Sequence, residues 1–225
     1  MTFSIVASCP RTRSFGVAIS SSSPAVAARC AHARAGAGAV ASQNITDPRL
    51  GAEALDLMAA GATAAAALAA IRARAPHIEY RQLALVDPSG GTSFFSGART
   101  LGRHHVIAGP GAVAAGNLLA DIAVPERMLE TFLATPDADF GDRLLAALAA
   151  GLAAGGEEGP VHSAGLLIVR DLPFPIADLR IDWHDTAPIA ALEKAWAIYK
   201  PELESYITRA LDPSAAPSYG VPGDV

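Results

Sequence analysis

Residues 1–23, MTFSIVASCPRTRSFGVAISSSS, decide the fold that we expect for this chain. Residues 2–8 alternate apolar and small polar side chains, which is the two-residue period of a half-buried strand. Residues 10–14 supply turn-forming side chains, and an apolar pattern resumes at 16–20. The stretch therefore predicts an antiparallel hairpin that starts at the second residue.

Strand and helix signals continue in pairs through the rest of the chain. Further strands are predicted at 38–43, 81–87, 92–96, 104–108, 113–116, 163–170 and 178–183. Helices are predicted at 48–61 behind an Asp47 cap, at 64–75 behind a Thr63 cap, and at 125–134, 138–154 and 188–210. This order disfavours a purely parallel sheet and predicts an α+β fold with helices covering two antiparallel sheets. Without linker composition or a repeat period, we predict one domain over 1–212 and a loose tail at 213–225.

Composition limits the class of protein. The 225 residues are 51% apolar and 17% charged, which is enough for a substantial core and excludes a disordered chain. No apolar run approaches the roughly 20 residues that cross a bilayer, and the first residues lack a secretory pattern. We therefore expect a cytoplasmic protein with no membrane partner. The two cysteines, Cys9 and Cys30, have no metal-ligand spacing and are predicted to be reduced, buried thiols.

Charge is distributed unevenly along the chain. The net charge of −5 disfavours a nucleic-acid partner. Residues 1–46 nevertheless contain four arginines, Arg11, Arg13, Arg29 and Arg34, and no acid, whereas the rest of the chain carries −9. This segment is compatible with a small anionic ligand, although short strands and a serine-rich turn also use few acids.

The motif that carries chemistry is the second residue. Phosphate-loop, GxSxG, HExxH and CxxC motifs are all absent from the sequence, and we predict no metal and no cofactor. Thr2 is small enough to permit removal of Met1. Its hydroxyl would then be a nucleophile, and its own α-amine, with a reference pKa of about 7.7, would be the base. A purely structural role for a threonine in a strand is the simpler alternative.

Several blocks of the sequence resemble one known family. They are MTFSIVA at 1–7, GVAISSS at 16–22, ARAGAGAVASQ at 33–43, LGAEALDLMAAG at 50–61, YRQLALVD at 80–87, AAGNLL at 114–119 and PIAALEKAWAIYKPELESYITRALDP at 188–213. Together they resemble an uncharacterised bacterial family with Ntn-hydrolase-like character, domain of unknown function 1028, over nearly the whole chain. The resemblance implies a four-layer αββα sandwich of two antiparallel sheets, with the first strand presenting its N-terminal residue in a cleft.

The same resemblance implies a set of site residues. Thr2 would attack, and the backbone amides of Ser42 or Gln43 would hold an oxyanion. Ser21 and Asn117 would position the amine or the substrate, although Asn117 and Gln43 also fit turn or capping roles. Arg29 or Arg34 would attract an anionic group.

The sequence departs from active Ntn hydrolases in two places. Many threonine-type members carry an Asp and a Lys near the nucleophile. Here residues 20–23 are all serine, and the two lysines, Lys194 and Lys200, lie in the final predicted helix. In the loop at 155–163, Glu157 and Glu158 remain, but Gly-Pro stands where an Arg is expected.

Two functions remain open from the sequence. The leading hypothesis is hydrolysis of the C–N bond of a small acylated amino compound, with Thr2 as nucleophile once Met1 is lost. The alternative is a non-catalytic protein on the same fold that binds a small ligand or supports assembly. The Ala/Leu-rich helices and the Trp-bearing final helix also favour a homodimer, although core packing explains the same residues.

Overall fold

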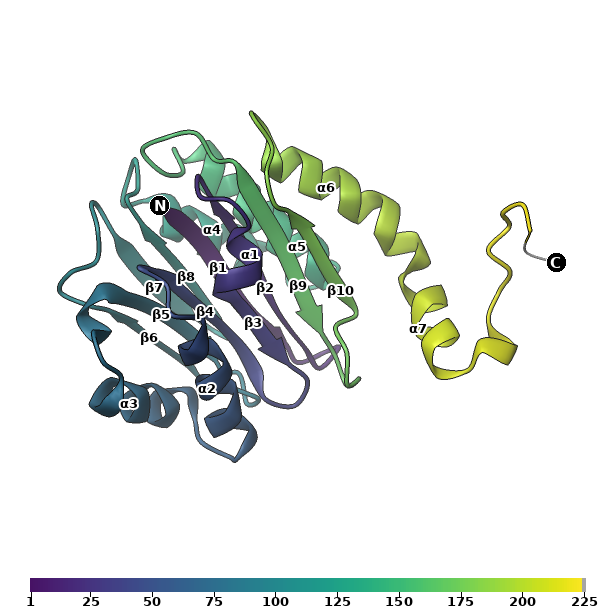
Figure 1. The fold of residues 1–225 in the computed structure, drawn as a ribbon, viewed down its shortest axis with the longest axis horizontal. Helices are drawn as coiled ribbons and strands as arrows, with labels where there is room; N and C mark the ends of the chain where they lie inside the picture. Colours follow the sequence, from purple (N-terminus) through teal and green to yellow (C-terminus); the bar gives the residue numbers. More distant parts are fainter. Residues whose placement is uncertain (224–225) are drawn as a thin grey trace.

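A computed structural model describes residues 1–223, whose strands form two antiparallel sheets (Figure 1). The larger sheet has the order β10-β9-β2-β1-β8-β7 and the smaller one β3-β4-β5-β6. The larger sheet consists of β1 (Thr2–Cys9), β2 (Ser14–Ser21), β7 (His105–Gly109), β8 (Ala112–Asn117), β9 (Ser163–Val169) and β10 (Ala177–Ile181). The smaller one consists of β3 (Ala31–Arg34), β4 (Gly38–Asn44), β5 (Arg81–Val86) and β6 (Thr92–Ser96). The prediction of an α+β fold with two antiparallel sheets is confirmed.

Helices connect and cover these strands. They are α1 (Val26–Cys30), α2 (Pro48–Ala59), α3 (Ala64–Arg74), α4 (Val124–Ala134), α5 (Phe140–Ala153), α6 (Pro188–Tyr199) and α7 (Leu203–Leu211). The two predicted caps are confirmed: the Asp47 side chain accepts the Arg49 amide at 3.1 Å, and Thr63 accepts the Ala66 amide at 3.2 Å. Among the described residues, no helix is both long and apolar enough to cross a bilayer.

The two faces of β1 pack against different layers. Phe3, Ile5 and Ala7 belong to a core cluster with residues of α4 and α5. Val6 belongs to a second cluster, which also contains residues of β4 and β5 from the smaller sheet. Because side chains alternate along a strand, Thr2 shares the face of Val6 and points toward the smaller sheet. A third cluster joins α2 and α3 to the other face of that sheet.

The prediction of one continuous helix over 188–210 is wrong in the middle of that range. The structure has α6, a 3₁₀ turn at Lys200–Glu202 and then α7. Pro201 explains the break, because proline has no backbone N–H and its ring collides with the preceding turn of a helix. Figure 1 shows that α6 runs beside β10 and that α7 leads the chain away from the sheets.

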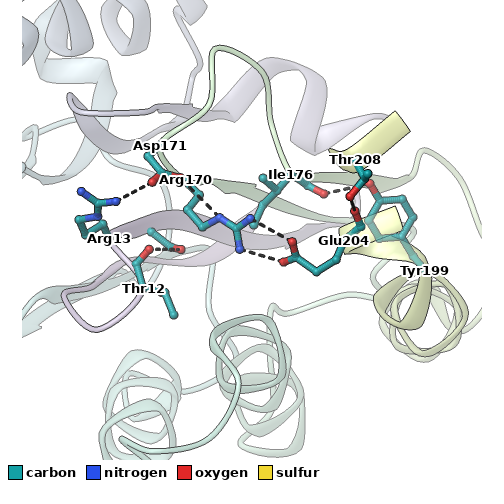
Figure 2. A network of polar contacts seen from close by, with 9 residues as sticks. Thr12, Arg13, Arg170, Asp171, Ile176, Tyr199, Glu204 and Thr208 are labelled. Carbon is teal, nitrogen blue, oxygen red and sulfur yellow. Dashed lines mark hydrogen bonds and ion pairs between the residues drawn. The ribbon is translucent and has the colours of Figure 1, made fainter. Parts of the chain in front are cut away.

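Polar contacts join the C-terminal arm, which consists of α6, α7 and the residues that follow them, to the edge of the larger sheet (Figure 2). Arg170, just after β9, donates to Glu204 of α7 at 2.9 Å, and the hydroxyl of Tyr199 donates to the Ile176 carbonyl at 2.9 Å. Several large apolar side chains of the arm are exposed, namely Ile198, Tyr206, Leu211, Tyr219 and Val221. The homodimer and the single domain over 1–212 stay predictions.

Candidate functional site

Three of the predicted site residues form one row across the larger sheet. Thr2 is paired with Asn117 of β8. On its other side the register pairs Phe3 with Ser20 of β2, so Ser21 lies next to Thr2. Residues opposite each other in an antiparallel sheet point to the same face. Asn117, Thr2 and Ser21 therefore all face the smaller sheet, and each is at most 5% exposed.

Met1 covers this row. The hydroxyls of Thr2 and Ser21 both donate to the Met1 carbonyl oxygen, and the two hydroxyl oxygens lie 3.4 Å apart. Met1 itself is 37% exposed, whereas Thr2 is 5% exposed. The nitrogen of Thr2 is here a peptide amide, so it cannot accept a proton from the hydroxyl. In this form of the chain, the α-amine predicted to act as the base is absent.

A buried hydrogen-bond network joins the row to the smaller sheet. Gln82 of β5 is at its centre: its Oε1 accepts Nε2 of Gln43 at 2.7 Å and Nδ2 of Asn117 at 3.1 Å. The Gln82 Nε2 group donates to the Gly116 carbonyl at 3.0 Å. Ser4 donates to Oε1 of Gln43 at 2.7 Å. The side chain of Gln43 is thus held by protein partners, and Gln82 is a site residue that the sequence analysis missed.

One buried acceptor in the row has no partner. Oδ1 of Asn117 makes no hydrogen bond to any described residue, although the whole residue is buried. A buried polar atom without a partner is costly, and native proteins contain few of them. Because Asn117 is paired directly with Thr2, this oxygen is available to a hydrogen-bond donor that arrives at the row.

Glu157 adds a titratable group next to the N-terminus. It is 4% exposed, and neither carboxylate oxygen has a hydrogen-bond partner among the described residues. Burial raises the pKa of Glu157 to about 7. The positive charge of the Met1 ammonium group opposes this rise in pKa in part. Ser22 lies near the carboxylate and opposes the rise too, although the two groups do not form a hydrogen bond. The sequence analysis noted this acid in the Gly-rich loop but gave it no catalytic role.

The comparisons with known proteins agree on a family. Residues 2–192 match the model of a family of unknown function, DUF1028. The chain belongs to this family. The crystal structure of protein SPO2555 from Silicibacter pomeroyi, also assigned to the DUF1028 model, is similar with a TM-score of 0.81 and 32% identity over 88% of each chain. No curated protein matches this DUF1028 chain. The resemblance seen in the sequence is confirmed, and the family carries no assigned function.

The remaining predicted residues of this DUF1028 member lie apart from the row. The Ser42 hydroxyl donates at 3.0 Å to the carbonyl of the residue that caps α2, so its side chain is turned away from the larger sheet. Arg29 donates to a carbonyl of the turn before α1, and Arg34 forms a 2.7 Å ion pair with Asp56. Neither guanidinium contacts Thr2 in the described part of the chain. The anion-attracting role of Arg29 and Arg34 gains no support from these contacts.

Three cavities of this DUF1028 chain lie away from Thr2. Residues 1–223 contain no group of three His, Cys, Asp or Glu side chains placed to hold a metal ion. Three cavities of about 400 to 640 Å³ lie instead beyond the other end of β1, around Ser14 and Cys9. With Met1 in place, Thr2 is 5% exposed.

Proposed function

We propose that the chain is an N-terminal-nucleophile hydrolase with the four-layer αββα order of the Ntn fold. Its reaction is hydrolysis of the C–N bond in a small acylated amino compound, with Thr2 as the nucleophile after loss of Met1. One observation carries the proposal. Thr2 is the first residue of a central strand, and its hydroxyl lies in a buried row of polar side chains, directly beside the first peptide bond of the chain.

The chemistry follows from removal of Met1. The amide nitrogen of Thr2 becomes an amine, and the hydroxyls of Thr2 and Ser21 lose their shared acceptor. The amine takes the hydroxyl proton as Oγ1 attacks the acyl carbon of the substrate. The C–N bond then breaks, and the proton passes to the departing amine. Water hydrolyses the resulting ester, which restores the Thr2 hydroxyl and releases the acid.

Neighbouring groups would support these steps. Ser21, which donates to the Met1 carbonyl, is placed to donate to the acyl carbonyl of a substrate. The unpartnered Oδ1 of Asn117 would accept an N–H of the Thr2 amine and orient it. Glu157, whose pKa is raised by burial in the Met1-containing chain, would take up the excess proton of that amine. The backbone amides of Ser42 or Gln43 would stabilise the oxyanion.

The experiment compares two forms of one protein. A chain whose cleavable leader leaves Thr2 as the first residue is tested beside a chain that keeps Met1, on a panel of small N-acyl amines and N-acyl amino acids. Release of free amine by the first form alone is the expected result. Equal rates in both forms, or retention of Met1 in protein isolated from its own cell by mass spectrometry, would rule the mechanism out.

A second function is favoured by the cover that Met1 provides. With Met1 in place Thr2 has no free amine, which suits a protein that binds a small ligand without turnover. Thermal-shift measurements on the Met1-containing form separate the two cases. If a compound of the panel raises the melting temperature of the protein and is recovered intact afterwards, the result supports binding without hydrolysis.

Replacing Glu157 with glutamine is expected to change how stability depends on pH. The pKa of Glu157 rises from 4.5 to about 7 in the folded chain, so the folded state binds this proton more tightly than the unfolded state. The wild-type chain therefore loses stability as pH rises from 4.5 through 7. Glu157→Gln removes this loss and should be more stable at pH 8 by up to roughly 3 kcal/mol, with little difference near pH 4.

Urea unfolding of both proteins between pH 4 and pH 8 checks this prediction. Glu158→Gln is the matched control, because Glu158 is half-exposed and forms a surface ion pair with Arg103. That control should keep the slope of the wild type. If Glu157→Gln also keeps it, the carboxyl group of Glu157 does not have the raised pKa.

A further inference from the structure

A second candidate site lies at the opposite end of β1. A cavity of about 640 Å³ is bounded by the β1–β2 turn on one side and by α4 and α5 on the other. Its lining includes Cys9, Arg11, Phe132, Asp137 and Arg143. Since β1 rises about 3.3 Å per residue, this cavity is roughly 20 Å from Thr2. It is therefore separate from the row described above.

Arg143 is a buried cation without a counterion. The residue is 7% exposed and projects from the first turns of α5. Its Nε and Nη2 donate to the Phe132 carbonyl at 3.2 and 3.0 Å, and its guanidinium lies 3.9 Å above the Phe132 ring. Among residues 1–223, no carboxylate lies within ion-pair distance of Arg143, and its Nη1 makes no hydrogen bond. Burial lowers the pKa of Arg143, and the more distant Asp137 carboxylate opposes this shift only in part.

An unpaired buried charge is expensive, because the lost hydration is not replaced. The cation–π contact and one carbonyl oxygen compensate only part of that cost. An oxyanion in the cavity would supply the missing counter-charge and accept the free N–H. Arg143 lines the cavity, so an oxyanion bound there would lie beside its guanidinium group.

The surroundings of the cavity already stabilise negative charge. Arg11 lines it as a second cation, whose Nη2 donates to the Ala138 carbonyl at 2.9 Å, and Asp137 on the rim is exposed. Burial alone would raise the pKa of the Cys9 thiol. The hydroxyl and amide of Thr12 and the guanidinium groups of Arg143 and Arg11 more than offset this, and the pKa of Cys9 is lowered.

We propose that this cavity binds a small molecule through a carboxylate or phosphate group, with Arg143 as the buried cation and Arg11 as the second. The acid-free first segment of the sequence, which is compatible with an anionic ligand, contributes Arg11 here. Arg29 and Arg34 of the same segment have partners elsewhere. The site does not depend on the hydrolytic function of Thr2.

Cys9 in the wall of the cavity allows a direct test with two reagents of nearly the same shape. In a Cys30→Ser background, Cys9 is the single thiol. Its thiolate displaces iodide from iodoacetate, an anion, or from iodoacetamide, which is neutral, and forms a C–S bond in each case. The ratio of the two rates is compared with the ratio for the same protein unfolded in urea. We expect this ratio to be roughly tenfold higher in the folded protein, because cations attract the anionic reagent.

Substitutions then identify the cations. Arg143→Gln and Arg11→Gln should each lower the ratio toward the value of the unfolded chain, and Arg143→Lys should keep most of the increase. Arg99→Gln makes the same change of charge at an exposed residue that does not line the cavity and should leave the ratio unchanged. Arg11 is exposed, so the Arg11→Gln protein tests the proposal even if Arg143→Gln fails to fold.

Competition distinguishes the two ligand groups. Inorganic phosphate and acetate are added separately at millimolar concentrations during labelling with iodoacetate. Slower labelling with phosphate indicates a phosphate-bearing ligand, and slower labelling with acetate indicates a carboxylate. The proposal is overturned if neither anion slows the reaction, or if the folded and unfolded proteins give the same ratio.

Discussion

Replacing Thr2 with alanine is expected to abolish C–N bond hydrolysis by the processed chain, with kcat/KM reduced at least about 1,000-fold. The substitution removes the nucleophilic oxygen and leaves the amine in place. Both proteins are produced with the same cleavable leader ahead of residue 2, so they share the same N-terminus. Release of amine from the most active compound of the panel, followed under steady-state conditions, measures the effect.

Serine at position 2 provides the matched control. Thr2→Ser keeps a hydroxyl beside the amine and should retain activity within about tenfold of the wild type. Ser21→Ala removes the donor proposed for the acyl carbonyl and should lower kcat/KM about 10- to 100-fold. Full activity in the Thr2→Ala protein would place the nucleophile elsewhere, and the serine run at 20–23 would be the next candidate.

The second large effect is expected on stability. Gln82→Leu should lower the free energy of unfolding by at least about 3 kcal/mol. Leucine cannot accept from Gln43 and Asn117 or donate to the Gly116 carbonyl, so three buried groups lose a partner. Each buried group left unsatisfied costs roughly 1 to 3 kcal/mol. Urea unfolding at neutral pH measures the total.

A neighbouring substitution tests whether the network is the cause. Ser96→Ala removes a single acceptor of the Gln82 Nε2 group, at 2.9 Å, and leaves the other three contacts intact. It should cost about 1 kcal/mol or less. If Gln82→Leu costs no more than Ser96→Ala, the bonds between the two sheets do not stabilise this end of the fold.

Much of the fold is predictable from short-range patterns. The strands at the N-terminus and the turn at 88–91 follow from a two-residue period and from turn residues. The sequence analysis did not predict the helix and strand at 26–34. The helix α1 has only five residues and no side-chain cap, and the left-handed backbone conformation of Ala25, which precedes it, leaves no signal in the sequence. The break at Pro201 was predictable, because a proline inside a helical pattern cannot donate the next backbone hydrogen bond.

The candidate site is predictable only in part. Thr2, Ser21 and Asn117 come together because strand register brings them into one row, and the resemblance pointed to all three. Gln82 lies in a strand of mostly apolar residues, and its partners come from three other strands. The raised pKa of Glu157 depends on burial by distant segments. Such long-range contacts leave no periodic signal in one sequence.

The cover that Met1 places over Thr2 has a practical consequence for anyone who purifies this protein. Under the proposed mechanism, an affinity tag fused ahead of residue 2 would keep the Thr2 nitrogen in a peptide bond, and a substrate screen with such protein would detect no turnover. A tag after α7, on the arm that leaves the sheets, avoids this. Under the proposed mechanism, removal of Met1 in the cell would be the step that creates the catalytic amine of Thr2.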